Sequence, residues 1–135
     1  MDAKEYLEQI KVLELRIKID TKQLEEIDEY LKEYKGNNLE AYQKRMQSLK
    51  DSIDNNRIKS IMWKDTILNQ IMTLSKPERV EILTKCYVEG IEFKHAAESM
   101  SYDYDYVRKI HSKALSEFAQ KYARQIEEYT IFSKK

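Results

Sequence analysis

The stretch LSKPERVEILTKCYVEGIEFKHAAESMSYDYDYVRKIHSKALSEF, residues 74–118, decides the fold. Three segments with helical apolar spacing follow one another in it. The first opens at Pro77 and stops at Gly90, the second spans 93–100, and the third begins at Asp103. The last two are separated by a turn of about three residues, which is the spacing of a helix-turn-helix.

The boundaries of these segments carry start signals. Ser75 and Glu78 have the spacing of a capping box, and Pro77 falls in the first turn, where its missing N–H does no harm. Ala96 and Ala97 suit a close crossing with the next helix. The last helix is expected over 103–129, with these apolar positions turned inward: Val107, Ile110, Ala114, Leu115 and Phe118.

The N-terminal half predicts two long helices. Apolar residues over 3–34 alternate in steps of three and four, interrupted by Asp20: Ile10, Leu13, Ile17, Leu24, Ile27, Leu31 and Tyr34. KGNN at 35–38 ends this helix, with Gly36 expected as a left-handed C′ residue. A second helix is expected over 39–74, with an apolar seam that resumes at Ile61, Met62 and Trp63 after a polar stretch.

Two arrangements of these helices remain open. The short link favours an antiparallel, coiled-coil-like helical hairpin, which would bring Asp20 near Asn55, Asn56 or Arg57. A parallel dimer through the first seam is the competing arrangement. The expected segments are therefore a helical arm at 1–74, a helix-turn-helix domain at 75–129 and a tail at 130–135.

Composition supports an all-α chain without an excess of charge. The 135 residues include 24 basic and 24 acidic side chains, two glycines and one proline. Few helix breakers favour helices throughout. A chain that coats nucleic acid without specificity usually carries a basic excess, so any nucleic-acid contact here must be local or shared with a partner.

Nothing in the sequence indicates an enzyme, a cofactor or a metal. Cys86 lies in an apolar run and is expected to be a buried, unreactive thiol. His95 and His111 stand apart on different helices, without the acids or cysteines of a metal site. There is no phosphate-binding glycine loop and no nucleophile motif. Without an apolar signal core or a membrane-length apolar run, we expect a cytoplasmic protein with no membrane contact.

The 74–118 stretch resembles region 4 of bacterial sigma factors, the part that reads an upstream promoter element. The resemblance rests on Leu74 with PER at 77–79, Y-x-EG at 87–90, Ala97 with Met100, Val107, and H-x-x-AL at 111–115. It covers about a third of the chain. Together with the long helical N-terminus that opens MDAKEYLEQ, the chain is similar to small phage and prophage proteins of Gram-positive bacteria that act as sigma-like or late-gene transcriptional regulators.

The first turns of the third helix hold the candidate DNA-contacting residues: Tyr104, Asp105, Arg108, Lys109, Ser112 and Lys113. Asp103 is expected to cap this helix through its carboxylate. Asp105 could accept from a cytosine amine, repel phosphates, or serve only the helix dipole. Tyr104 and Tyr106 could contact phosphates or form a protein interface.

We therefore expect a sequence-specific DNA-binding regulator. Its partners would be promoter DNA, RNA polymerase and a second copy bound through the N-terminal helices. The alternative is a protein-interaction module with a sigma-like fold that binds polymerase, a repressor or another regulator without reading DNA. The zero net charge of the chain and the two acids of the stretch YDYDY, residues 102–106, favour this alternative.

Overall fold

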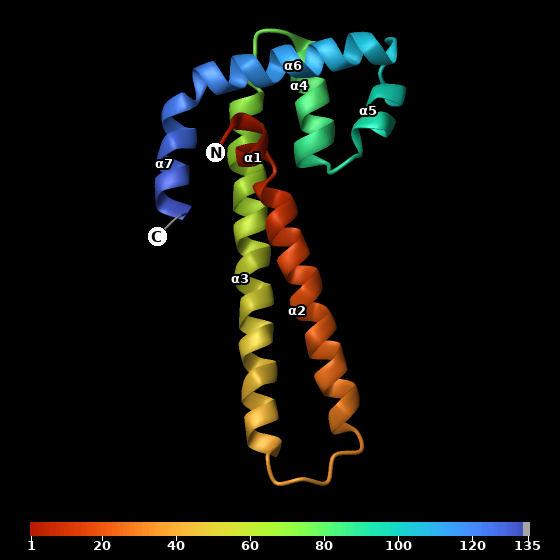
Figure 1. The fold of residues 1–135 in the computed structure, drawn as a ribbon, viewed down its shortest axis with the longest axis vertical. Helices are drawn as coiled ribbons and strands as arrows, with labels where there is room; N and C mark the ends of the chain where they lie inside the picture. Colours follow the sequence, from red (N-terminus) through yellow and green to blue (C-terminus); the bar gives the residue numbers. More distant parts are fainter. Residues whose placement is uncertain (134–135) are drawn as a thin grey trace. The chain divides into compact units, whose positions relative to one another are not determined.

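The computed structural model describes residues 1–133 and is all-helical (Figure 1), with 82% of the chain in helices and no strand among the described residues. The chain divides into two compact units. The terminal unit contains Met1–Ile10 together with the chain from Trp63 onward, and the middle unit contains Lys11–Met62. The elements, in chain order, are α1 (Ala3–Leu7), α2 (Gln9–Leu31), α3 (Leu39–Ile71), α4 (Pro77–Leu83), a π-helical turn (Thr84–Val88), α5 (Phe93–Ser99), α6 (Tyr104–Lys121) and α7 (Ala123–Ser133).

The core of the terminal unit joins the two ends of the chain. The Tyr6 ring lies 4.8 Å from Trp63, 5.7 Å from Tyr129 and 5.9 Å from Phe118, measured between ring centroids. Helix α6 packs against α1, α4, α5 and α7. The compact units therefore do not follow the expected boundary at residue 74, because α1 and the end of α3 supply part of this core.

Helix α1 is separate from the long helix expected over 3–34. The Asp2 carboxylate accepts a hydrogen bond from the Glu5 backbone N–H at 2.8 Å, a cap worth about 0.5–2 kcal/mol. The helix ends at Glu8, and its buried residues Tyr6 and Leu7 belong to the terminal core. Because of this break, α1 packs into the core of the terminal unit, which the heptad pattern of residues 3–34 does not predict.

The capping box expected at Ser75 and Glu78 does not form. The residue before α4 is Lys76, which makes no side-chain cap, and Pro77 is the first helical residue as predicted. The Ser75 hydroxyl and backbone N–H both donate to Glu117 of α6, each at 2.9 Å. Ser75 therefore bonds to the Glu117 carboxylate instead of capping α4.

Later boundaries depend on one glycine and one tyrosine. Gly90 ends the π-helical turn with φ +71°, in the left-handed region that favours glycine. The helix expected to run unbroken over 103–129 is interrupted at Tyr122, whose ring lies 4.9 Å from Phe118 and whose hydroxyl is 2.7 Å from that of Thr73. Helix α7 continues to Ser133, so the expected tail begins in helix, and residues 134–135 lie outside the described residues.

In the middle unit, α2 and α3 run in opposite directions. Asp20 accepts from the Ser52 hydroxyl at 2.8 Å, and the Arg45 guanidinium donates to the Gln23 side chain at 3.2 Å. Asp20 is 1% exposed and also accepts from Arg16 at 3.2 Å. A polar layer at Asp20 was expected, but its partner is Ser52 rather than Asn55, Asn56 or Arg57.

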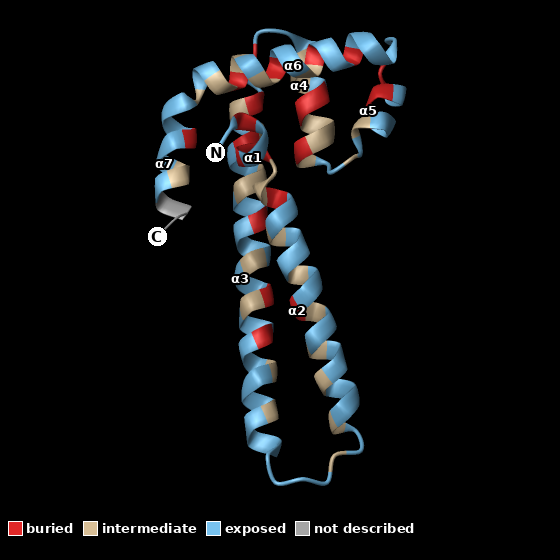
Figure 2. Ribbon diagram, in the orientation of Figure 1, coloured by how far each residue is buried: buried red, intermediate tan, exposed pale blue. Residues whose placement is uncertain are grey.

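The apolar seam between α2 and α3 is only partly covered in the middle unit (Figure 2). Leu49 and Ile53 are buried, whereas the α2 seam residues beyond Asp20 are half-buried. Ile61 and Met62, expected in the seam, are 69% and 64% exposed. Other aliphatic side chains are also exposed: Val12, Leu15, Ile19, Leu39 and Ile58.

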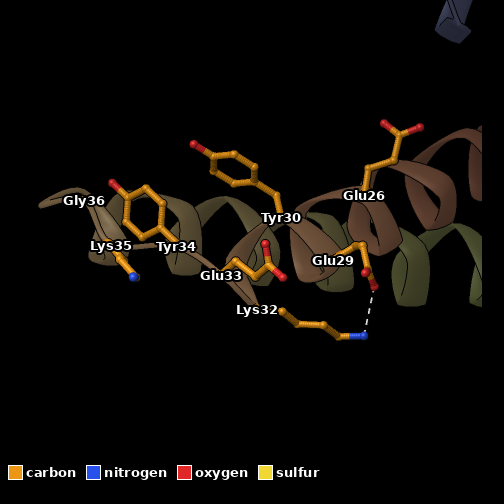
Figure 3. Close-up of a pocket in the computed structure, with 8 residues that line it drawn as sticks. All are labelled: Glu26, Glu29, Tyr30, Lys32, Glu33, Tyr34, Lys35 and Gly36. Atoms are coloured by element: carbon orange, nitrogen blue, oxygen red, sulfur yellow. Dashed lines mark hydrogen bonds and ion pairs between the residues drawn. The ribbon is translucent and has the colours of Figure 1, made fainter.

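The link between α2 and α3 is shaped by tyrosine rather than by a left-handed glycine. Gly36 does not have a positive φ, contrary to expectation. The Tyr34 ring lies across it instead, so that a Cβ on Gly36 would overlap the Tyr34 hydroxyl oxygen. The same oxygen accepts the Asn38 backbone N–H at 2.9 Å. Figure 3 shows this tyrosine beside Tyr30 at the end of α2.

Candidate nucleic-acid interface

Helix α6 starts where the sequence predicts, but without the predicted cap bond. Asp103 is the N-cap residue with extended backbone (φ −58°, ψ 146°), and its side chain makes no capping hydrogen bond. A four-residue turn, Met100–Asp103, separates α5 from α6. The first turn of α6 therefore presents free backbone N–H groups and a free Asp103 carboxylate to its surroundings.

The buried and exposed sides of α6 are cleanly separated. Val107, Ile110, Ala114 and Phe118 are buried. All six candidate contact residues are exposed: Tyr104, Asp105, Arg108, Lys109, Ser112 and Lys113. With about 100° of rotation per residue, Asp105 and Ser112 lie opposite the buried side. The same rotation places Arg108 on one flank of this face and Lys109 on the other.

The cations of this face are available for an external partner. Arg108, Lys109 and Lys113 have neither an ion pair nor a hydrogen bond within residues 1–133. By contrast, Arg79 and Lys85 of the same unit pair with acids at 2.8 and 3.1 Å. A cluster of unpaired cations opposite a buried helix face can bind phosphate or another anionic surface.

The tyrosines of YDYDY line the edges of the face. The Tyr104 ring lies 5.5 Å from Phe93 of α5, and the Tyr102 and Tyr106 rings lie 5.0 Å apart. All three remain about half exposed. Tyr102 lies in the turn between α5 and α6, with its side chain exposed. Rings held this way offer both an apolar surface and a hydroxyl to a partner.

His111 faces inward from the same helix. Its Nε2 is 2.9 Å from the Tyr87 hydroxyl, and its ring lies 5.2 Å from Phe93. Burial, and secondarily the positive charge of Lys4, lowers the pKa of His111 below 6.5. Burial likewise raises the pKa of Tyr87. Because the His111 Nε2 already bonds to the Tyr87 hydroxyl, His111 helps to hold α6 in place and is not part of its exposed face.

Glu117 fixes α6 to the start of α4, a role that sequence reasoning missed. Its carboxylate pairs with the Arg79 guanidinium at 2.8 Å, and both side chains are less than one-fifth exposed. The bond from Arg79, and then those from Ser75, hold the pKa of Glu117 below 4.5. The residues are 38 positions apart, so no short motif reveals the pair.

Ser116 was also missed. It is exposed and one turn beyond Ser112, on the side of α6 opposite the buried residues. The sequence does contain a signal for it, because Asp105, Ser112 and Ser116 recur at helical spacing. The exposed face thus extends from Tyr104 to Ser116, about 18 Å along the helix.

No protein-family model, curated protein or solved structure matches the chain. Within residues 1–133, no group of three or more potential metal ligands gathers. The same residues contain no helix with the length and apolar character needed to cross a membrane.

Proposed function

We propose that the chain is a sequence-specific, DNA-binding transcriptional regulator of phage type that acts in the cytoplasm. In this proposal α5 and α6 form a helix-turn-helix, and α6 is the helix that enters the major groove. The observation that carries it is the set of three unpaired cations on the exposed face of α6, next to a four-residue turn. The resemblance of residues 74–118 to sigma region 4 supports the same function, with RNA polymerase as a second partner.

The role of each residue follows from its place on α6. Arg108, Lys109 and Lys113 would contact phosphates or base edges, as cationic side chains do in DNA complexes. The hydroxyls of Tyr104 and Ser112 would donate hydrogen bonds to the phosphate backbone of the DNA. Asp105, in the first turn, would meet a base edge.

Dimerisation through the N-terminal helices belongs to the proposal. We interpret α2 and α3 as a coiled-coil-like helical hairpin, supported by the Asp20–Ser52 and Gln23–Arg45 bonds. Its exposed aliphatic side chains would be covered by a second copy. A dimer would double the phosphate contacts of a domain whose residues 75–124 carry a net charge of only +1.

A protein-interaction module is the second candidate. The acid at the centre of the exposed face and three half-exposed tyrosines favour it, because such a surface also suits a protein partner. In that case α6 would bind polymerase, a repressor or another regulator without reading DNA.

The two candidates differ in the salt dependence of DNA binding. We expect duplexes selected from a random pool to bind with an affinity that falls steeply as salt rises. Changing Arg108 and Lys109 together to Ala should abolish selective binding and reduce the log–log salt slope by about 2. The matched control is Lys50→Ala with Lys59→Ala, which removes two exposed cations from α3.

Either of two results would reject the DNA-binding role of this face. One is wild-type protein that shows no salt-dependent affinity at low ionic strength. The other is unchanged binding by the Arg108 and Lys109 variant. A stable protein partner found together with the first result would establish the interaction module instead.

A further inference from the structure

The side of α2 that faces away from α3 carries a stripe of exposed aliphatic residues. Val12, Leu15 and Ile19 are 57%, 58% and 46% exposed. Their steps of three and four residues place them on one side of the helix, because an α-helix turns about 100° per residue. The half-buried seam residues Leu13 and Ile17 lie on the other side. Within residues 1–133 this aliphatic stripe is therefore left uncovered.

Lysines border the aliphatic stripe along the first half of α2. Lys11, Lys18 and Lys22 are exposed and form neither an ion pair nor a hydrogen bond within residues 1–133. The rotation of about 100° per residue places all three on the same flank of the stripe. Residues 11–22 contain four cations and two acids, a net charge of +2.

The second half of α2 is acidic on the same side of the helix. Helical spacing continues the aliphatic stripe to Glu26 and Glu33. Together with Tyr30, which is 56% exposed, they line one hollow near the end of α2 (Figure 3). Residues 23–35 contain five acids and two lysines, a net charge of −3.

The cations near this acidic half do not neutralise it. Lys32 pairs with Glu29 at 2.9 Å, and Arg45 of α3 donates to the Gln23 side chain at 3.2 Å. Including Arg45 with residues 23–35 still leaves a net charge of −2. The acids Glu26 and Glu33 themselves form no ion pair within the described residues.

The helix dipole does not account for this order of charges. Acids stabilise the N-terminal end of a helix, and cations stabilise its C-terminal end. Helix α2 has no acid in its first turn and no cation in its last turn, and Asp28 and Glu29 lie near its C-terminal end. The charges therefore run opposite to the order that stabilises an isolated helix, and a partner outside the chain provides a physical reason for them.

We propose that α2 of one copy packs antiparallel against α2 of a second copy, through the aliphatic stripe and the charges beside it. The two-fold axis passes near Lys22, so the basic first half of each helix meets the acidic second half of the other. A parallel pairing would instead place lysines against lysines and acids against acids. The contact extends over residues 11–33, about 33 Å of helix.

The antiparallel direction brings complementary side chains together. The facing pairs are Lys11 with the partner's Glu33, Lys18 with the partner's Glu26, and Leu15 with the partner's Tyr30. Each pair occurs twice because the dimer is symmetric. The inference rests on the dimer that the proposed function includes, and it adds which helix forms the dimer and in which direction.

The test is sedimentation equilibrium of the full-length chain without DNA, over a range of protein and salt concentrations. We expect a monomer–dimer equilibrium that shifts toward monomer as salt rises, because the charges are exposed. Lys11→Glu with Lys18→Glu makes both halves of the stripe acidic, and Glu26→Lys with Glu33→Lys makes both halves basic. Each double variant should dimerise about tenfold or more weakly than wild type. An equimolar mixture of the two should form a one-to-one heterodimer.

A variant with all four changes tests the direction of packing. It exchanges the basic and acidic halves, so antiparallel copies again meet with opposite charges and the dimer should return. In a parallel dimer the four changes would leave like charges facing each other. The control Lys50→Glu with Lys59→Glu changes two exposed cations of α3 and should dimerise as wild type. Circular dichroism verifies that each variant is folded.

Three results would overturn the proposal. They are a wild-type chain that stays monomeric at low salt, dimerisation that is unchanged in both double variants, and a fourfold variant that dimerises no better than the double variants. Because no DNA is present, each of these results rejects the α2 dimer and leaves the DNA contacts proposed for α6 to their own test.

Discussion

Asp105 is the one acid on α6 between residues 104 and 116, and it lies opposite the buried side of that helix. In a major groove such a carboxylate accepts from a cytosine amine and repels phosphate. We therefore predict that Asp105→Ala relaxes selectivity at one base pair by about 1–3 kcal/mol while non-specific affinity rises. Binding to duplexes changed one base pair at a time measures both effects.

Asp103 provides the comparison for this change. It precedes the helix and makes no cap bond, so Asp103→Ala should leave base selectivity unaltered. If Asp105→Ala raises affinity equally for every sequence, the carboxylate repels phosphate without reading a base. Selective weakening by Asp103→Ala alone would move the base contact to the N-cap.

His111 makes stability depend on pH. The pKa of His111 is lowered in the folded chain. Below about pH 6.5 its imidazole is therefore protonated more fully in the unfolded chain, and the folded chain loses stability as the pH decreases. The rings of Tyr87 from the π-helical turn and Phe93 from α5 pack against His111, and the positive charge of Lys4 in α1 lowers its pKa further.

We predict that lowering the pH from 7 to 5.5 reduces the free energy of unfolding more in wild type than in His111→Gln. The free energy of urea unfolding at the two pH values provides the measurement. Asp20 and Glu117 have lowered pKa values, so their contributions are lost only below about 3.8 and 4.5. An equal loss in both proteins would show that His111 does not titrate on unfolding.

At the scale of elements, an ion pair between Glu117 and Arg79 connects α6 to α4. Removing it leaves Arg79 partly buried without its acid and frees the Ser75 N–H and hydroxyl. We predict that Glu117→Ala lowers the free energy of unfolding by about 1–3 kcal/mol. Chemical denaturation followed by circular dichroism measures it.

An exposed pair provides the matched control for this change. Arg124 and Glu128 lie 3.0 Å apart on α7, and both are mostly exposed. Glu128→Ala should change stability by about 0.5 kcal/mol or less. Similar losses in the two variants would mean that the Glu117 network contributes no more than a surface pair.

Element types were predictable from the sequence, whereas several ends were not. Apolar spacing gave the all-helical class, and Pro77 and Asp103 correctly placed the starts of α4 and α6. The capping box failed because Ser75 bonds to Glu117, and the 103–129 helix is interrupted at Tyr122, whose hydroxyl contacts that of Thr73. Such contacts join residues distant in sequence, and local pattern does not encode them.

The same distinction holds at the candidate interface. The six predicted contact residues are exposed on α6 because period 3.6 separates them from the buried residues. Ser116 was accessible to the same reasoning. The Glu117–Arg79 pair and the His111–Tyr87 bond were not, because they depend on how α6 packs against α4 and the π-helical turn.

For the whole molecule, the division into units depends on aromatic packing between distant segments. The sequence predicts a boundary after residue 74, where Ser75, Pro77 and Glu78 have the spacing of a helix start. The structure instead includes Tyr6 and Trp63 in the core with Phe118 and Tyr129. No periodicity within a single helix indicates that Tyr6 and Tyr129 share a core.

This packing predicts which part of the chain folds alone. A variant in which a flexible linker of about six Gly and Ser residues replaces 11–62 retains every buried residue of the terminal unit. It should unfold cooperatively, because its core is intact. A fragment starting at residue 75 lacks Tyr6, Leu7, Ile67 and Ile71 and should show no cooperative transition.

Thermal unfolding followed by circular dichroism compares the two proteins directly. Fluorescence of Trp63, the sole tryptophan, adds a readout for the linked variant, because its ring packs on Tyr6 and Tyr129. A cooperative 75–135 fragment would show that the C-terminal helices need neither α1 nor the end of α3, and would favour the boundary at residue 74. If only the linked variant folds, residues 1–10 and 63–74 together belong to the domain that carries α6, and a protein that lacks both should lose any activity of that helix.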